Sequence, residues 1–191
     1  MAKGMNIELK KKKERAGAVI RQLLYILLMV TGYIFISTVN LKVMPLLPVC
    51  CGVCYAVREE PFNSALYGCA CGLLLDCAQD TLIGFNAILL MWSCLLISLL
   101  FHCFLRRHVV NFLLLDLGVI MLRGLLHYLF FYEIWDYDLT GQIFAKIFLP
   151  EMLLTNLAGA VLYWLTGVIA GRFGIVTEHY IEEKSEDIVR E

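Results

Sequence analysis

Charged residues are scarce in this chain. They make up 17% of its 191 residues, whereas hydrophobic residues make up 60%. With a mean hydropathy of +0.75, this composition excludes an ordinary soluble globular domain. No polar segment is long enough to fold by itself. The sequence therefore predicts an integral membrane protein.

The sequence also lacks the motifs that carry most enzyme chemistry. It has no phosphate-cradling glycine loop, no His-Glu-x-x-His metal site and no Gly-x-Ser-x-Gly nucleophile turn. Its histidines are scattered, at His102, His108, His127 and His179. We expect no enzymatic activity, no cofactor and no nucleic-acid partner.

Eight cysteines raise the question of a metal site or disulfides. They include the run Cys50-Cys51-x-x-Cys54, and all eight fall within apolar stretches. Cysteine behaves there as a small apolar residue, and no histidine pair accompanies it at ligand spacing. The pattern favours buried thiols over a metal centre.

Windows of about 20 residues, enough to cross roughly 30 Å of hydrocarbon, give six candidate spans. They are residues 22–41, 43–57, 62–79, 84–105, 109–132 and 144–171. The second is short and carries Pro45 and Pro48, which predict an irregular start followed by a brief helix. We predict an all-α integral membrane protein, a compact bundle of about six transmembrane helices with the second short and broken by proline.

Lysine and arginine are retained on the cytoplasmic side of membrane proteins, and they predict the orientation here. They gather in the segments that face inward when both termini are cytoplasmic. We predict a basic cytoplasmic segment at 1–21, a six-span domain at 22–171 and an acidic cytoplasmic tail at 172–191. The lysines at 10–13 then form a solvated flank that contacts membrane lipid.

The third span places small residues and one carboxylate on a single helical stripe. Gly68, Gly72 and Asp76 are spaced four residues apart. Two glycines at this spacing let another backbone approach closely. An aspartate inside a bilayer needs a partner, a polar cavity or a proton, so Asp76 is the principal candidate for a functional position.

A candidate partner lies on the fifth span. Asp116, Arg123 and His127 share one face of that helix and should point inward, with Arg123 near mid-membrane. An unpaired aspartate or arginine there costs roughly 2.5 to 3.5 kcal/mol. We predict that Asp76 or Asp116 neutralises Arg123, either to lock the helices together or to serve a function.

A second polar cluster opens the sixth span. Pro150 predicts a kink, Glu151 is expected in the outer interface, and Asn156 is expected to bond across helices. Packing is the favoured role for this cluster.

Together these residues resemble a known family, the bacterial rod shape-determining membrane protein MreD. The resemblance is carried by Arg58-Glu59-x-Pro61, Gly68-x-x-x-Gly72-Leu-Leu-Leu-Asp76, Gly84-x-Asn86-Ala87, and Pro150 with Asn156. It implies a non-catalytic, multi-pass protein of the bacterial cytoplasmic membrane. Such a protein belongs to the machinery that elongates the cell wall and maintains rod shape.

The resemblance also implies partners. These are an MreC-like membrane-anchored protein and, indirectly, an MreB-like filament, a RodA-like glycosyltransferase and its penicillin-binding protein. On this chain, the glycine stripe and Asp76 would shape the bundle core or a groove for a partner.

Two other classes stay open. A substrate-binding subunit of an energy-coupling-factor vitamin transporter has a similar size, but its docking surface uses alanines in the first helix and residues 22–41 contain none. A small ion-coupled transporter could use buried ionisable groups as a relay. Its candidates are Asp76, Asp116, Arg123 and Glu151.

Overall fold

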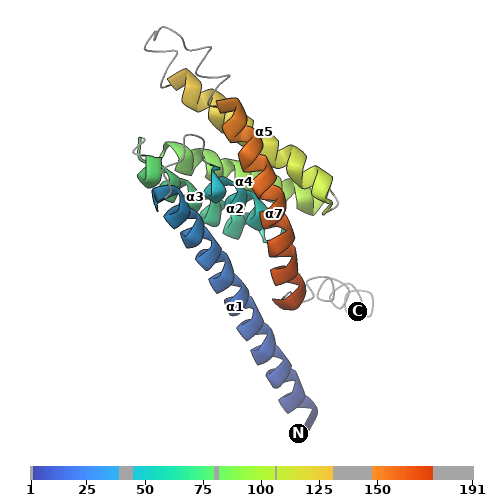
Figure 1. Cartoon of the computed structure of the whole chain (residues 1–191). Coiled ribbons are helices and arrows are strands. Elements are labelled where there is room, and N and C mark those ends of the chain that lie inside the picture. Colours follow the sequence, from blue (N-terminus) through green and yellow to red (C-terminus); the bar gives the residue numbers. More distant parts are fainter. Residues whose placement is uncertain (1, 39–44, 80–81, 106, 131–147, 174–191) are drawn as a thin grey trace.

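The computed structural model describes residues 2–38, 45–79, 82–105, 107–130 and 148–173, and this part of the chain is helical with short connections (Figure 1). Its six helices are α1 (Ala2–Thr38), α2 (Leu47–Ala56), α3 (Pro61–Gln79), α4 (Phe85–Cys103), α5 (Val109–Tyr128) and α7 (Leu149–Phe173). The predicted all-α class is confirmed.

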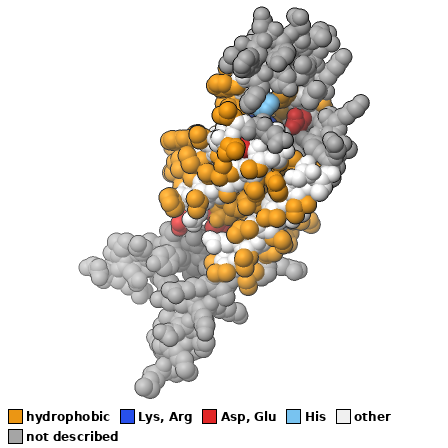
Figure 2. All heavy atoms as spheres, turned by 90° about the vertical axis from the view of Figure 1, so that its left-hand side faces the viewer, with side chains coloured by type: hydrophobic (Ala, Val, Ile, Leu, Met, Phe, Trp, Pro, Cys, Tyr) orange, Lys and Arg blue, Asp and Glu red, His pale blue; other side chains and the backbone are white. Residues whose placement is uncertain are grey.

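Four of these helices contain stretches long and apolar enough to cross a membrane. The stretches are Gly17–Thr38, Phe85–Cys103, Val109–Tyr128 and Leu149–Gly171. Hydrophobic side chains cover much of the described surface that Figure 2 shows, as expected of a protein surrounded by lipid. The predicted membrane character is thus supported, with α2 and α3 packed beside the four long helices.

The first helix is longer than the sequence predicted. The boundary expected at residue 21 does not interrupt it, because α1 runs continuously from Ala2 to Thr38 and extends beyond the other helices (Figure 1). Residues 2–21 include no proline that would end a helix. The last three residues of the predicted span, 39–41, lie outside the described residues.

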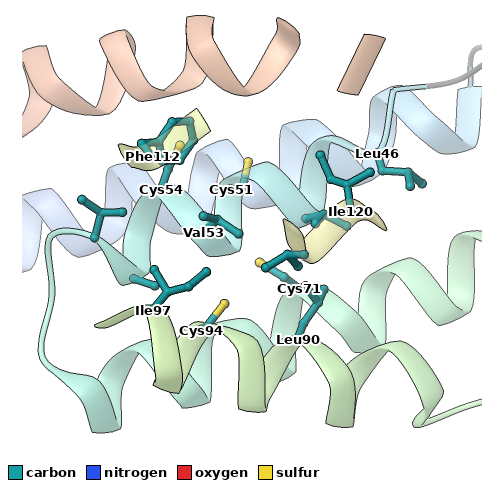
Figure 3. Close-up of a cluster of buried hydrophobic side chains, with 14 of the residues drawn as sticks. Leu46, Cys51, Val53, Cys54, Cys71, Leu90, Cys94, Ile97, Phe112 and Ile120 are labelled. Atoms are coloured by element: carbon teal, nitrogen blue, oxygen red, sulfur yellow. The ribbon is translucent and has the colours of Figure 1, made fainter. Parts of the chain in front are cut away.

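Helix α2 forms the centre of the bundle. Its ten residues rise only about 15 Å, too short for a bilayer, and all but the first are buried. It contacts α1, α3, α4, α5 and α7, and its side chains form the middle of the apolar cluster in Figure 3. Pro48 lies in its first turn, where a missing backbone donor is tolerated. The prediction of a brief helix after a proline-rich start is confirmed.

Small thiols help α2, α3 and α4 pack closely. A Cβ added at Gly52 would lie 3.3 Å from the Cys94 Sγ and 3.8 Å from the Cys71 Cβ. Cys69 is half-buried and Cys77 and Cys103 are exposed, while the other five cysteines are buried, and all eight are free thiols. These buried thiols act as small core residues.

The short connection between α2 and α3 ties three further helices together. The Arg58 Nη2 donates to the Tyr163 carbonyl oxygen on α7 at 3.1 Å. The Glu59 carboxylate pairs with Arg21 on α1, with 2.8 Å between Oε1 and Nε. The Glu59 carbonyl oxygen accepts a hydrogen bond from Ser98 on α4 at 2.8 Å. This connection therefore fixes one end of the bundle.

Glu59 makes the stability of this end depend on pH. Burial raises the pKa of its carboxyl above 4.5, and the Arg21 guanidinium opposes part of that rise. Because the folded state then binds the proton more tightly than the unfolded state, the free energy of unfolding should fall as pH rises from 4.5 through the raised folded pKa. Denaturant titrations in detergent across this range measure the slope.

Two variants separate this effect from other carboxyl groups. Glu59→Gln should remove that part of the slope, whereas Glu60→Gln should retain it because Glu60 is the exposed neighbour. Equal slopes in the wild type and in Glu59→Gln would contradict the assignment to Glu59.

Candidate functional site at the junction of α3 and α4

The glycine stripe of α3 is covered by α4. A Cβ added at Gly72 would lie 2.4 Å from the Ala87 Cα, and one at Gly68 would lie 2.7 Å from the Leu90 carbonyl oxygen. Neither distance leaves room for a side chain. The expected close approach of another backbone is confirmed, and because α4 of the same chain makes it, the stripe is part of the core and is not a free groove.

Asp76 caps the start of α4. Its Oδ2 accepts the Gly84 backbone N–H at 2.8 Å, and its Oδ1 accepts the Asn86 backbone N–H at 3.1 Å. The first N–H groups of a helix have no partner within the helix, and a carboxylate also interacts favourably with the positive end of the helix dipole. Gly84 has a φ of 103°, a left-handed conformation that favours glycine. The buried carboxylate therefore finds its donors at a helix end.

Asn86 links Asp76 to Arg123. Its Nδ2 donates to the Asp76 Oδ1 at 2.7 Å, and its Oδ1 accepts from the Arg123 Nε at 2.8 Å. The Arg123 Nη2 also donates to the Gln79 Oε1. Asp76, Asn86 and Arg123 are all buried. Among the described residues, the predicted link between Asp76 and Arg123 is thus made through an amide, which orients both charged groups.

The position of Arg123 is in the second half of α5, and its predicted depth in the membrane stays a prediction. It lies five residues before Tyr128, the end of α5, and therefore not at the centre of that helix. Asp76 likewise lies three residues before Gln79, where α3 ends. The network of Asp76, Gln79, Asn86 and Arg123, which we term the junction network, is consequently close to one end of the bundle.

The start of α7 lies on the same side of the bundle. Glu151 is half-buried in the first turn of α7 and interacts electrostatically with Arg123, as does Asp76. Pro150 also lies in this first turn, where proline fits the beginning of a helix; the kink predicted there stays a prediction. The Asn156 Oδ1 is buried and accepts no hydrogen bond from the described residues, so the cross-helix bond expected at that oxygen is not seen there.

Asp116 is separate from the junction network. It is buried against α2 and α7, where its Oδ2 faces the Cys50 Sγ at 3.7 Å and a Cβ at Gly159 would lie 2.5 Å away. Asp116 and Arg123 are both buried on α5, as the predicted polar stripe requires, while His127 is half-buried. In the described structure, Asp116 therefore contributes no contact to Arg123.

The sequence analysis missed several partners. Gln79 is three residues after Asp76 on the same helical face, a spacing that could have suggested it. The ion pair between Arg21 and Glu59 was harder to predict, because the sequence shows only two opposite charges at the borders of apolar runs. The backbone donors at the start of α4 could be inferred only from the turn residue Gly84.

An apolar groove lies between α1, α2 and α7. Its volume is about 130 Å³, and its lining residues are Leu28, Thr31, Gly32, Phe35, Leu47, Cys51 and Leu162. Sites for small organic ligands typically enclose about 300–1,000 Å³ and include a few convergent polar groups. This groove is too small and too apolar for a vitamin-sized ligand.

The fold and the junction network define an all-α membrane protein whose buried polar residues join helix ends. No family model matches the chain, and neither a curated protein nor a solved structure is significantly similar to it.

Proposed function

We propose that this chain is a non-catalytic component of the machinery that elongates the bacterial cell wall, as its resemblance to the MreD family implies. The observation that carries the proposal is that the residues of two of these motifs, on α3 and at the start of α4, are spatial neighbours. Gly68 and Gly72 contact α4 closely, while Asp76 bonds to the Gly84 and Asn86 that open α4. Motif residues that contact one another in one structural unit support the family resemblance more strongly than the same residues would if they were scattered through the fold.

The junction network also favours a structural role. Its members satisfy one another: the carboxylate caps a helix, and the amides of Asn86 and Gln79 accept from Arg123. A fully bonded buried polar network rigidifies and specifies a bundle. This arrangement suits a scaffold that presents a fixed surface to other membrane proteins.

The proposed location is the bacterial cytoplasmic membrane, with both termini in the cytoplasm. The first residues of α1 and the last residues of α7 point toward the same end of the molecule in Figure 1. The proposed direct partner is an MreC-like anchored protein, through which an MreB-like filament and the RodA-like synthase with its penicillin-binding protein would be reached.

Depletion of the protein in a rod-shaped host tests this function. We expect rods to round up and new wall material to be inserted at the wrong sites, with rescue by the wild-type chain. Affinity purification of the tagged chain from the same membranes should retain the MreC-like protein. Unchanged cell shape in a host without a second copy would contradict the proposal, as would a vitamin bound stoichiometrically to the purified protein.

A further inference from the structure

Asp116 is a buried acid that the junction network does not use. Its side chain has 0% exposure, and it lies two turns into α5, inside the apolar stretch Val109–Tyr128. The Oδ2 has only the weak thiol donor of Cys50, at 3.7 Å, and the Oδ1 has no hydrogen-bond partner among the described residues. This is a sparse environment for a carboxylate.

No described cation offsets a charge at this position. The ionisable groups of neighbouring helices that interact with Asp116 are thiols, namely Cys50, Cys51 and Cys54 on α2 and Cys94 on α4. On α5 itself, Arg123 is seven residues away, about 10 Å along the axis, and donates to Asn86 and Gln79. The Gly159 of α7 contributes no ionisable group.

An unpaired carboxylate in an apolar interior is strongly unfavourable, whereas a neutral acid of the same shape is tolerated. We infer that the junction of α2, α5 and α7 is a proton-binding site, in which Asp116 holds a proton while α7 is packed against it. This inference goes beyond the proposed function and does not depend on it.

Packing couples the proton to the position of α7. A Cβ at Gly159 would lie 2.5 Å from the Asp116 Oδ2 and 3.3 Å from the Cys50 Sγ, so the α7 backbone lies directly over the carboxyl group. The Cys50 thiol also faces the Thr155 carbonyl oxygen of α7, at 3.2 Å. A water molecule has no space between these groups. Loss of the proton therefore requires α7 to move away so that water can solvate the carboxylate.

Infrared spectroscopy of the full-length protein in lipid tests the proton directly. The wild type at neutral pH should show the carbonyl stretch of a protonated carboxylic acid, and that band should be missing in Asp116→Asn. Carbon-13 labelling of aspartate should shift the band in the wild type. Identical wild-type and Asp116→Asn spectra in this region would overturn the inference.

Thiol alkylation with quantitative mass spectrometry tests the coupling to α7. Cys50 contacts both Asp116 and α7, whereas Cys71 is equally buried on α3 and serves as a matched reference for global opening. As pH rises, the labelling of Cys50 relative to Cys71 should increase about tenfold per pH unit until Asp116 is half ionised. In Asp116→Asn, which cannot ionise, the ratio should stay constant.

The comparison remains decisive if the Asn variant does not fold, because the two cysteines are measured in the same wild-type molecules. A Cys50 to Cys71 ratio that is independent of pH in the wild type would overturn the coupling. So would the same pH dependence in the wild type and in a folded Asp116→Asn protein.

Discussion

Gly72→Ala is expected to lower the free energy of unfolding of the bundle by about 2–3 kcal/mol or more. The added Cβ would lie 2.4 Å from the Ala87 Cα and 2.5 Å from the Asn86 carbonyl oxygen. Both contacts are with backbone atoms, which cannot move aside unless α3 and α4 separate. Separation would also displace Asn86 from Asp76 and weaken the junction network. Unfolding in mixed detergent micelles, followed by circular dichroism, measures the loss.

The same substitution at two other glycines provides a graded control. At Gly68 the nearest atom is the Leu90 carbonyl oxygen at 2.7 Å, so Gly68→Ala should have a smaller effect. At Gly118 an added Cβ would meet no atom within 4 Å beyond its chain neighbours and the backbone of its own helix, and alanine there should be neutral or stabilise the helix by up to about 1 kcal/mol. Equal stabilities for Gly72→Ala and Gly118→Ala would show that close packing of α3 on α4 does not support the fold.

The tight packing of α3 and the shortness of α2 could be predicted because both follow from local patterns. Four-residue spacing puts Gly68, Gly72 and Asp76 on one face whatever the surroundings are. The prolines at 45 and 48 likewise limit α2 directly, through a missing donor and a fixed φ. Such local constraints can be read from the sequence without knowledge of any tertiary contact.

The partner of Asp76 could not be predicted in the same way. The sequence analysis predicted Arg123 as a partner because an unpaired charge inside a membrane is unfavourable. In the structure, the Asp76 carboxylate oxygens instead accept backbone N–H groups at the start of α4. Backbone N–H groups are present at every residue and acquire this role only when a helix begins beside the acid. Gly84, at the start of α4, has a left-handed backbone conformation, and such turn geometry is a weak sequence signal.

The stripe of α5 shows a related limit. Asp116 and Arg123 do share a helical face, yet Asp116 contacts α2 and α7 whereas Arg123 contacts residues of α3 and α4. Helical periodicity determines which face of α5 a side chain occupies. The contacts of that side chain depend on which neighbouring helix crosses α5 at its position along the helix axis. The two ionisable groups on one stripe therefore belong to different sites.

Asp76→Ala is expected to destabilise the protein more than any other substitution in the junction network. It should lower the free energy of unfolding by roughly 3–5 kcal/mol, the range for a buried charge that loses its partner. It removes the acceptor for three N–H groups of Gly84 and Asn86, and it takes away a carboxylate that stabilises the buried Arg123. Unsatisfied donors in an apolar interior cost about 1–3 kcal/mol each, so α4 should fray from its first turn. Hydrogen exchange at the amides of Gly84 and Asn86 should accelerate before the rest of the helix unfolds.

Two further variants show whether the effect depends on the charge or on the site. Asp76→Asn keeps one acceptor oxygen but turns an amide toward backbone donors, so its loss of stability should fall between those of the wild type and Asp76→Ala. Cys77→Ala, at the exposed neighbouring position, should change stability by less than about 0.5 kcal/mol. Because Asp76 joins α3 to α4 and, through Asn86, to α5, its loss should also loosen Arg123. If Asp76→Ala unfolded at the same denaturant concentration as Cys77→Ala, the carboxylate would not be the group that holds these three helices together.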